Sequence, residues 1–498
     1  MKTNRIPAFF LVLLMIATML SPVSAFASEA ESSENPYSGI SVGSATPEAT
    51  PEPEKLFDDG EGFVCDKLTE PNSQSIFMIS LDTDTVVYTL NPDDRRPMAS
   101  MTKIMSYIVA AELIDDLHNT RTAVPASVEE ELAGTGSSLA YIKTGEEFSI
   151  YELLNLMMVP SGNDAALTIA KYVDSLNIAA TEEDQEFDEN GDGLMSFVEM
   201  MNRKAAELGC TNTHFVNAHG LHDFNHYSTA REMAAISMHA LTLPYFADIV
   251  AQQYYTQTPT NMTEEERSVQ TSNRMLLSWM SEYYTYATGL KTGSLNESGY
   301  CISATAHYDG YTYLVVCMGS PYIDSYGAKT NYHGEMFDAA TLFRWAFLNI
   351  ENKTIVADGD LIGEVPLKYA WEKDTLQVVA KGNVTAMLPK ILEENDIQTI
   401  ISLPENVPAP VKKGDVLGSA LYMYKGEILA EVPLIASESV ERSEVIQTIE
   451  QGKEILSSTW FVITAVVIVT LTVVYIALMI SMNRKRRKMR RIRKYRDL

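Results

Sequence analysis

Ser100 and Lys103 are the first residues whose types and spacing suggest chemistry, within the segment Pro97 to Met105. Residues three apart share one face of a helix, so the lysine amine can lie against the serine hydroxyl. A serine alcohol is a weak nucleophile that needs an adjacent base, and a lysine partly removed from water can have its pKa lowered enough to serve. Ser-x-x-Lys also arises by chance, in which case Ser100 would cap a helix and Lys103 would be solvated.

Two further polar motifs follow along the chain. Ser161-Gly162-Asn163 comes after the stretch Tyr151 to Pro160, and Lys291-Thr292-Gly293-Ser294 comes just before a strong hairpin signal. With Ser-x-x-Lys they match, in order, the Ser-x-x-Lys, Ser-Asp-Asn and Lys-Thr-Gly set shared by penicillin-binding proteins and class A β-lactamases, with Gly162 in place of the aspartate. The three motifs lie at a helix start, in a loop after a helix and on a strand.

The sequence resembles the low-molecular-mass penicillin-binding proteins, which are serine-type D-alanyl-D-alanine carboxypeptidases. The resemblance covers about residues 63–437 and includes further segments, which are Asn212 to Phe215, His219 to Leu221, Tyr227 to Arg231, Gly299 to Cys301, Ala409 to Gly414 and Glu431 to Leu434. The implied fold is an α/β (α+β) serine DD-peptidase and β-lactamase-like domain, then a small all-β domain, then a C-terminal transmembrane helix.

The resemblance assigns the proton transfers to a few side chains. Ser100 would attack the carbonyl of the penultimate D-Ala of a peptidoglycan stem peptide, and Lys103 would accept its proton. Ser161 and Lys291 would relay a proton to the amine of the leaving D-Ala. Lys329 is the candidate for an extra cation that holds the substrate carboxylate. No cofactor is required for this chemistry, and β-lactam antibiotics are the expected inhibitors.

The remaining motif positions would hold the substrate. Asn163 would hydrogen-bond the substrate backbone, and Thr292 would meet the terminal carboxylate. The backbone amides of Ser100 and Ser294 would form the oxyanion hole, where loss of one donor typically costs about 10²- to 10³-fold in rate. Gly293 would let the substrate approach the strand closely, because a side chain there would stand in the way.

Two other functions fit the same motifs. A β-lactamase would need a glutamate that drives rapid deacylation, and Glu199, with Asn202 three residues on, is its one counterpart. The second domain and the membrane helix argue against a β-lactamase. A catalytically silent penicillin-binding or wall-binding protein would keep the fold without turnover, which the intact Ser100, Lys103 and Lys291 disfavour.

Four histidines, His214, His219, His222 and His226, lie within thirteen positions of one another. Such a cluster resembles a set of metal ligands or a general base. Their spacing does not match a zinc-binding helix motif, however, and the family pattern makes His214 and His219 structural. We therefore expect no metal ligand among them.

The acidic segment 188–199 fits the pattern of a calcium-binding loop at all of its specified positions. The expected ligands are side-chain oxygens and one backbone carbonyl, from Asp188, Asn190, Asp192, Leu194, Ser196 and Glu199. A bound calcium ion would be structural, because it would hold together carboxylates that otherwise repel one another. The alternative is a solvated acidic insertion.

Strand patterns occur both before and after a long helical block. The segment Ser75 to Leu90 reads as two strands around Asp82-Thr83-Asp84, and helical patterns dominate from there to about Leu241. Strands return from Thr285, where Asp309-Gly310 predicts a hairpin. A helix over Met336 to Asn349 would close the domain. This order predicts one α/β domain whose sheet is assembled from both ends of the segment.

The four cysteines are not expected to form disulfides, although the protein reads as exported. In the hairpin around Asp309-Gly310, Cys301 lies opposite Met318, so Cys317 points to the other face of the sheet and cannot reach it. Cys65 and Cys210 carry no signal for pairing.

The two ends of the chain indicate export and anchoring. Lys2 and Arg5 precede an apolar stretch and a small-residue cleavage site, which is typical of a secretory signal peptide. The uncharged run Trp460 to Ile480 is long enough to span a bilayer and is followed by ten basic residues, which should stay cytoplasmic. We expect a single-pass protein of the cell membrane with its catalytic domain on the extracytoplasmic side.

Composition is consistent with this division of the chain. The sequence predicts a signal peptide at 1–27, a low-complexity spacer at 28–58, a DD-peptidase domain at 59–350, a β-rich domain at 351–437, a linker at 438–458, a transmembrane helix at 459–482 and a basic tail at 483–498. The net charge of −28 includes the basic tail, so the outer part is more acidic still. Such a surface repels nucleic acid, which is excluded as a partner.

Overall fold

The sheet of the catalytic domain joins strands from both ends of that domain. The computed structural model describes residues 62–181, 184, 186–187, 189, 193–393 and 396–496. Five antiparallel strands stand in the order β2-β1-β9-β8-β7. Their bounds are β1 Ser75–Ser80, β2 Val86–Leu90, β7 Ala287–Leu295, β8 Gly299–Tyr308 and β9 Tyr311–Ser320. The predicted assembly of the sheet is confirmed.

The hairpin between β8 and β9 forms at the predicted turn. Asp309 and Gly310 both have positive φ, as a tight two-residue turn requires. Tyr308 pairs with Tyr311, and a bulge between Tyr300 and Ile302 shifts the far end of the ladder. Cys65, Cys210, Cys301 and Cys317 are all free and buried, which confirms that these cysteines form no disulfide.

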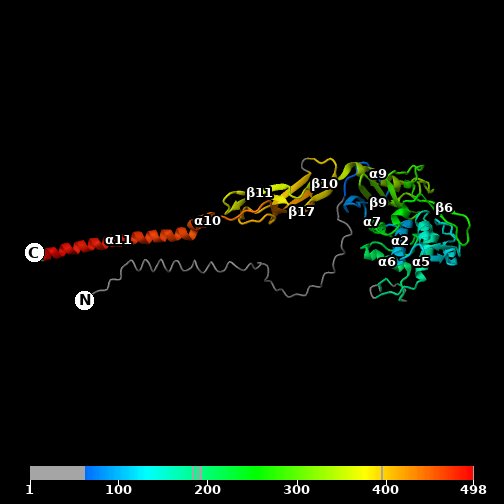
Figure 1. Cartoon of the computed structure of the whole chain (residues 1–498), viewed down its shortest axis with the longest axis horizontal. Helices are drawn as coiled ribbons and strands as arrows, with labels where there is room; N and C mark the ends of the chain where they lie inside the picture. The colour runs from blue at the N-terminus through cyan, green and yellow to red at the C-terminus, as the bar shows by residue number, and fades with distance from the viewer. Residues whose placement is uncertain are drawn as a thin grey trace. The chain divides into compact units, whose positions relative to one another are not determined.

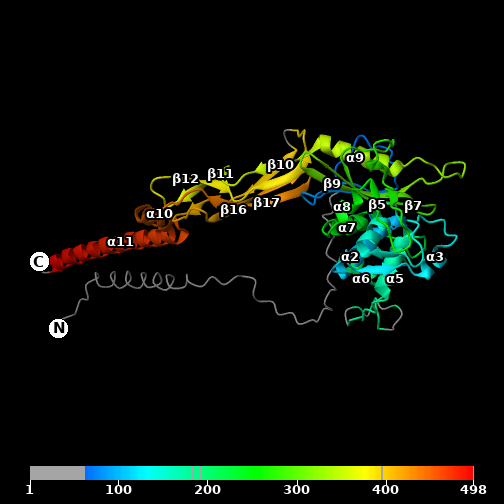
Figure 2. The ribbon, with the colours of Figure 1, turned by 45° about the vertical axis from the view of Figure 1, so that its right-hand side comes forward.

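Alternate residues of the sheet face two separate cores. Phe77 and Ile79 pack with the helical block, whereas Ile76 and Met78 pack with residues of α9 (Gly334–Asn349). Figures 1 and 2 show α9 on one side of β9, and α2 and α7 on the other. The domain therefore has three layers, which are α9, the sheet and the helical block. The sheet can pack on both sides because successive side chains of a strand point to opposite faces.

The helical block contains the long middle of the domain. Its helices are α2 Thr102–Leu113, α3 Ala126–Leu132, α4 Ile150–Met158, α5 Asn163–Asp174, α6 Phe197–Glu207, α7 Ala230–Leu241 and α8 Phe246–Val250. Short pieces between them are β3 Arg121–Ala123, β4 Glu147–Ser149, β5 Tyr254–Gln257, β6 Arg267–Gln270 and the 3-10 helix η3 Arg274–Leu276. Helix α4 begins at a capping box between Ser149 and Glu152. That box fixes where the helix leading to the Ser-Gly-Asn motif starts.

A second, all-β part follows α9. Its strands are β10 Ile350–Val356, β11 Leu361–Lys368, β12 Thr375–Ala380, β13 Val384–Pro389, β14 Ile397–Ser402, β15 Val407–Pro408, β16 Val416–Tyr424 and β17 Glu427–Ala436. Six of them form one sheet in the order β14-β16-β17-β12-β11-β15, and β10 pairs with β13. A third core cluster, which includes Val365, Leu434 and Ala420, lies within this part. Ile350, at the expected domain boundary, still packs in the core beside α9.

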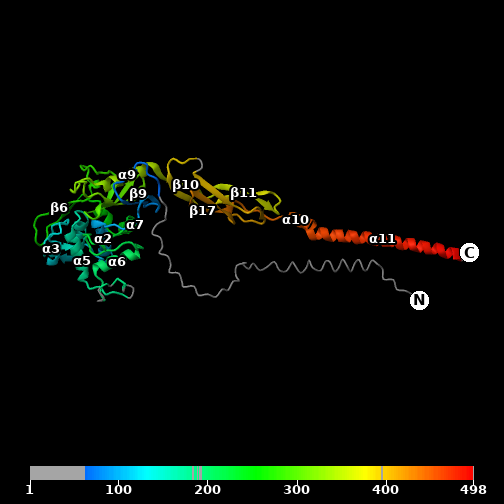
Figure 3. The ribbon, with the colours of Figure 1, turned by 180° about the vertical axis from the view of Figure 1, so that it is seen from behind.

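The C-terminal region is helical. Helix α10 (Glu444–Ser457) occupies most of the segment 438–458, for which the sequence predicts a linker. Its apolar residues recur at helical spacing, which favours a helix over an extended linker. Helix α11 (Thr459–Arg496) follows it along the chain (Figure 3).

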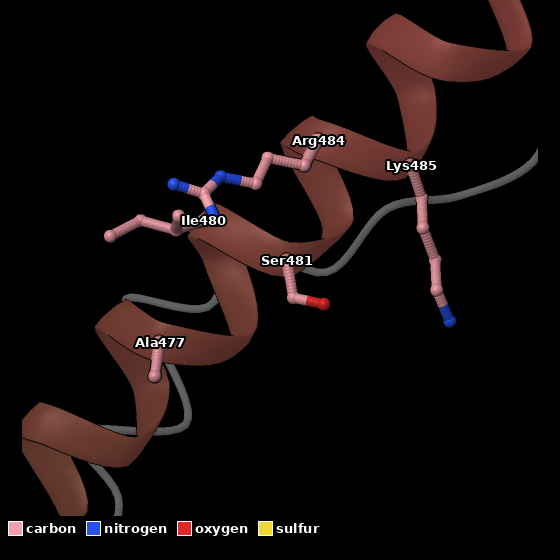
Figure 4. Close-up of a pocket in the computed structure, with 5 residues that line it drawn as sticks. All are labelled: Ala477, Ile480, Ser481, Arg484 and Lys485. Atoms are coloured by element: carbon pink, nitrogen blue, oxygen red, sulfur yellow. The ribbon is translucent and has the colours of Figure 1, made fainter.

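Helix α11 contains the segment that the sequence predicts to span a membrane. Within the described residues one helix, Thr459–Arg487, is long and apolar enough to cross a bilayer. The apolar run of this helix ends after Ile480 and Ser481, where the basic residues Arg484 and Lys485 follow (Figure 4). The predicted signal peptide and spacer lie outside the described residues.

Candidate active site

Ser100 lies in a short 3-10 helix, η1 (Ala99–Met101), that runs directly into α2. Ala99 has a φ of 48°, a left-handed conformation that is uncommon for a residue with a side chain. Gly220 packs so closely that a Cβ there would lie 2.0 Å from the Ala99 carbonyl oxygen. Ser100 therefore lies on a turn that is held in place by its neighbours.

Lys103 is fully buried in the first turn of α2. Its Nζ lies 2.9 Å from Ser100 Oγ, 2.6 Å from Asn163 Oδ1 and 2.9 Å from the carbonyl oxygen of His219. The predicted contact between the lysine and the serine is present. The alternative in which Lys103 is a solvated surface residue is excluded.

Both lysines of the site have lowered pKa values. Burial, together with the nearby charge of Lys291, holds the pKa of Lys103 well below its usual range, although Asp164 acts in the opposite direction. Burial lowers the pKa of Lys291 to about 7. Removing a charged amine from water favours its neutral form, and a neutral amine is what a general base requires.

The Ser-Gly-Asn motif lies between α4 and α5. Ser161 is buried and has a φ of 66°, and its hydroxyl makes no hydrogen bond to any other described residue. Asn163 begins α5 and binds Lys103 through Oδ1. A Cβ on Gly162 would lie 2.7 Å from the Leu156 carbonyl oxygen and 2.8 Å from Asp164 Oδ1. Steric crowding explains why glycine occupies the position where the motif has aspartate.

Strand β7 supplies the opposite wall. Lys291 is buried, and its Nζ lies 3.1 Å from the Thr292 carbonyl oxygen and 3.5 Å from Ser272 Oγ. Ser272 Oγ is 2.7 Å from Thr292 Oγ1, and its amide donates to the Val159 carbonyl. Sequence reasoning missed Ser272, because it belongs to no motif and comes to β7 only through the fold.

Gly293 packs against the segment that carries Ser100, whereas the sequence predicted a close approach of substrate. A Cβ at this position would lie 2.6 Å from the Met98 carbonyl oxygen and 3.3 Å from the Ser100 amide nitrogen. The glycine therefore lets β7 approach η1, whereas the sequence suggested only an approach of substrate to the strand. Ser294, next along β7, is exposed. The strand thus runs close to the Ser100 amide, as two oxyanion donors require.

Lys329 lies on the surface. It is exposed, and its Nζ stacks on the Tyr322 ring, 4.6 Å from the ring centroid. Tyr322 in turn packs against Tyr300, which pairs with Ser294 across β7 and β8. Contacts through the rings of Tyr322 and Tyr300 therefore connect Lys329 to the strand position paired with Ser294.

His226 is buried and forms part of a chain of hydrogen bonds. Its Nδ1 accepts from the Val216 amide at 3.0 Å, so Nε2 carries the proton and donates to Thr102 Oγ1 at 2.7 Å. The Thr102 hydroxyl donates in turn to the Ala99 carbonyl at 2.7 Å. Burial lowers the pKa of His226 to about 4, so the ring is neutral.

The other histidines also have structural contacts. His219 is buried, and burial together with the charge of Lys103 lowers its pKa to about 3. Its carbonyl, and not its ring, contacts Lys103. His214 Nδ1 lies 2.7 Å from the Asn225 carbonyl. Among the described residues, no group of three or more His, Cys, Asp or Glu is placed to hold a metal ion.

The predicted calcium ligands are only partly described. Asp188, Asn190 and Asp192 lie outside the described residues. Ser196 caps α6, and its amide donates to Glu199 Oε2 at 2.7 Å. Glu199 Oε1 accepts from the Glu189 amide at 2.8 Å. Both carboxylate oxygens of Glu199 thus accept backbone amides near the start of α6. Leu194 forms a β-bridge with Ala179.

Two family models match the chain. The model described as D-alanyl-D-alanine carboxypeptidase matches residues 65–183 and 187–321, and the model of the penicillin-binding protein 5 C-terminal domain matches residues 351–442. The D-alanyl-D-alanine carboxypeptidase DacF of Bacillus subtilis is 27% identical over 374 residues, covering 75% of this chain and 87% of the relative. DacA of Haemophilus influenzae is 28% identical over 370 residues, covering 73% and 84%.

Solved structures of D-alanyl-D-alanine carboxypeptidases and of penicillin-binding protein 5 share the fold of this chain. Penicillin-binding protein 5 from Haemophilus influenzae superposes with a TM-score of 0.51 at 25% identity, covering 75% of this chain and 98% of that chain. The carboxypeptidase DacD from Francisella tularensis has a TM-score of 0.55 at 22% identity, covering 79% and 97%. At 22% identity the second comparison shows a shared fold alone.

Proposed function

The chain belongs to the family of serine-type D-alanyl-D-alanine carboxypeptidases, and on this premise we propose which of its residues carry the reaction. The reaction is removal of the terminal D-Ala from peptidoglycan stem peptides through an acyl-enzyme. The observation that carries the assignment is the position of the buried Lys103 amine, 2.9 Å from Ser100 Oγ.

Lys103 is arranged to act as the base for Ser100. A neutral amine has two N–H bonds and one lone pair. Asn163 Oδ1 and the His219 carbonyl are acceptors only, so they take the two N–H bonds. The lone pair is then left for the Ser100 hydroxyl proton. In the same step the serine oxygen bonds to the carbonyl carbon of the penultimate D-Ala, and the negative charge moves to the carbonyl oxygen.

The walls of the site stabilise that charge and hold the substrate. The amides of Ser100 and Ser294 form the oxyanion hole in this proposal, supported by the close approach of β7 to η1 at Gly293. Thr292, hydrogen-bonded to Ser272, meets the terminal carboxylate. Asn163 Nδ2, which donates to no other described residue, is available for a backbone carbonyl of the acyl part.

Ser161 and Lys291 deliver the proton to the leaving amine. The C–N bond breaks as the oxyanion collapses, and the departing D-Ala amine must gain a proton. Lys291, with a pKa near 7, can be protonated at neutral pH and can exchange that proton through the Ser161 hydroxyl. Water then hydrolyses the ester and regenerates Ser100.

A β-lactamase is disfavoured by the place of Glu199. Both of its carboxylate oxygens accept backbone N–H groups around the start of α6. A carboxylate in this role caps a helix and is not presented as a base for deacylation. A penicillin ester on Ser100 should therefore hydrolyse slowly, which accounts for penicillin sensitivity.

The wider setting of the reaction is also proposed. Helix α11 anchors the chain in the cell membrane with the catalytic domain outside, supported by its apolar length and by the basic residues after it. We also propose the division into domains that the sequence predicts, with α10 inside the segment 438–458. We keep the structural calcium site at 188–199 as a proposal, with a solvated acidic insertion as its alternative.

Release of D-Ala from a stem pentapeptide tests the function. The full chain in detergent should release one D-Ala per peptide and should form a stable covalent adduct with a labelled penicillin. Ser100→Ala should lose both. If the variant keeps its label, Ser100 is not the nucleophile. If the wild-type chain is labelled but releases no D-Ala, the chain is a silent penicillin-binding protein.

A further inference from the structure

Tyr141 combines two features that are unusual for a tyrosine. It is 76% exposed, although aromatic side chains usually bury most of their surface. Its φ is 59°, in the left-handed region that residues with a side chain adopt at a cost. Glycine would suit such a position better. Strained backbone of this kind is common at functional sites.

The backbone on both sides of Tyr141 is held by one buried carboxylate. Asp164 is 4% exposed, and its oxygens accept the amides of Ala140 at 2.9 Å and Ile142 at 3.2 Å. Its Oδ1 also accepts the amide of Ala165 at 3.0 Å. Because the two residues that flank Tyr141 are fixed, the strained conformation is maintained and the side chain remains outside.

The same contacts place the backbone of Tyr141 next to the start of α5. Asp164 follows Asn163, whose Oδ1 binds the catalytic lysine. The amide of Asn163 donates to the Ser138 carbonyl at 2.8 Å. The segment 138–142 is thus hydrogen-bonded to the start of α5. In the proposed mechanism, this is the side of the site where Asn163 binds the acyl part of the substrate.

We propose that Tyr141 is a substrate-contacting residue that binds the side chain of the amino acid preceding the D-Ala-D-Ala pair. This inference rests on the proposed function, since it assumes that the acyl part lies along Asn163. A tyrosine ring offers an apolar face and a polar end. Its complement is a side chain with a long aliphatic stem and a polar tip, such as that of lysine.

Two peptides that differ only at this amino acid test the inference. One carries lysine before D-Ala-D-Ala and the other carries alanine, and kcat/KM for D-Ala release is measured with the full chain in detergent. The wild-type chain should prefer the lysine peptide. Tyr141→Ala and Tyr141→Gly should lower that preference by about tenfold, the scale of a lost contact in an apolar pocket. Tyr141→Phe should keep most of it.

Stability separates this role from a structural one. Tyr141→Gly relieves the left-handed strain, so its melting temperature should not fall while its preference does. Tyr369→Gly is the matched control, because Tyr369 has a φ of 64° but lies in the β-rich part. It should leave the preference unchanged.

Three results would overturn the inference. If the wild-type chain has nearly the same kcat/KM for both peptides, Tyr141 does not bind this side chain. The same conclusion follows if Tyr141→Gly keeps the full preference for the lysine peptide. An equal loss in Tyr369→Gly shows that the effect is not local. If the wild-type chain releases D-Ala from neither peptide, the proposed function fails and this inference falls with it.

Discussion

At the scale of single residues, the proposed mechanism assigns the proton transfers to two buried lysines. Lys103 is next to Ser100 and Lys291 lies on β7, and the charge of Lys291 is one of the causes that lower the pKa of Lys103. The pair can therefore divide the work, with the neutral amine as base and the charged amine as donor. Pairs of titratable groups whose surroundings give them different protonation states are typical of acid and base catalysis.

Lys103→Arg tests the base directly. The guanidinium group stays protonated in proteins, so it cannot accept the Ser100 proton. We expect a folded protein whose acylation by penicillin is slower by about 10²- to 10⁴-fold, the usual contribution of general base catalysis. Stopped-flow or gel-based labelling measures the rate. An acylation rate above about a tenth of the wild-type value would assign the base elsewhere.

The pH profile of kcat/KM follows from the two lowered pKa values. Activity should rise with pH as Lys103 loses its proton, because the base must be neutral. It should fall as pH passes about 7, where Lys291 loses the proton that the leaving amine requires. The expected profile is a bell with its alkaline limb near neutrality.

Lys291→Arg is the control for that profile. Arginine keeps its charge well above neutral pH, so the alkaline limb should disappear from the accessible range even if the overall rate is lower. If the alkaline limb of the kcat/KM profile stays near pH 7 in this variant, it reports the titration of a residue other than Lys291.

At the scale of elements, η1 is clamped from three sides. Gly220 and Gly293 leave no room for a Cβ against the segment Met98 to Ser100. On the third side, the chain of hydrogen bonds from His226 through Thr102 ends on the Ala99 carbonyl. Positioning matters because misplacement of a nucleophile by about 1 Å can cost about 10²-fold in rate.

Thr102→Val should loosen this clamp. Valine fills the same buried space but lacks the hydroxyl, so the His226 Nε2–H loses its acceptor. An unsatisfied buried donor costs about 1–3 kcal/mol, so the melting temperature should fall. Acylation of Ser100 should slow by roughly tenfold. Thr102→Ser restores the hydroxyl and should recover most of the acylation rate, and equal rates in Thr102→Val and wild type would contradict a positioning role.

The acidic segment 188–199 is tested at the same scale. If it binds calcium, the ion should stabilise the start of α6, to which Ser196 and Glu199 belong. At a calcium concentration ten times the dissociation constant, binding adds about 1.4 kcal/mol to the free energy of unfolding. Calorimetry at millimolar calcium should then show a higher melting temperature that Asp188→Ala lacks. An equal shift in the variant, or none in the wild type, would support a solvated insertion.

At the scale of the whole molecule, the chain joins a catalytic domain, a β-rich part and a long apolar helix. The family match to residues 351–442 shows that the β-rich part is shared with penicillin-binding protein 5. The apolar part of α11 is exposed to its surroundings in the described structure, which suits lipid better than water.

Removal of residues 459–498 tests the anchor. The full chain should remain in the membrane pellet after an alkaline wash, whereas the truncated chain should appear in the soluble fraction. D-Ala release from a small peptide should stay within about twofold, because the site lies far along the chain from α11 and surface changes away from the site are usually small. A truncated chain that still sediments with membranes would indicate a second anchor.

Patterns between near neighbours in the sequence were sufficient for much of this description. The Ser100 and Lys103 spacing, the Asp309-Gly310 turn, the closing helix α9 and the apolar run of α11 each depend on residues within a few positions of one another. Physical rules for helices, turns and membrane spans act over that range. The order of the three motifs, together with the resemblance, then indicated the family and the roles of the motif residues.

Packing between distant segments decided the rest. Lys103 meets Asn163 and the His219 carbonyl across separations of 60 and 116 residues. Burial of the amine in the folded domain, together with the charge of Lys291, lowers its pKa. Ser272 reaches β7 and Asp164 holds the backbone around Tyr141 for the same reason. A side chain's protonation state and its partners depend on the dielectric and geometry of a folded cleft, which no local pattern contains. Only the tertiary structure could show why Gly220 and Gly293 are glycines, because the atoms that a Cβ would meet there come from the distant segment Met98 to Ser100.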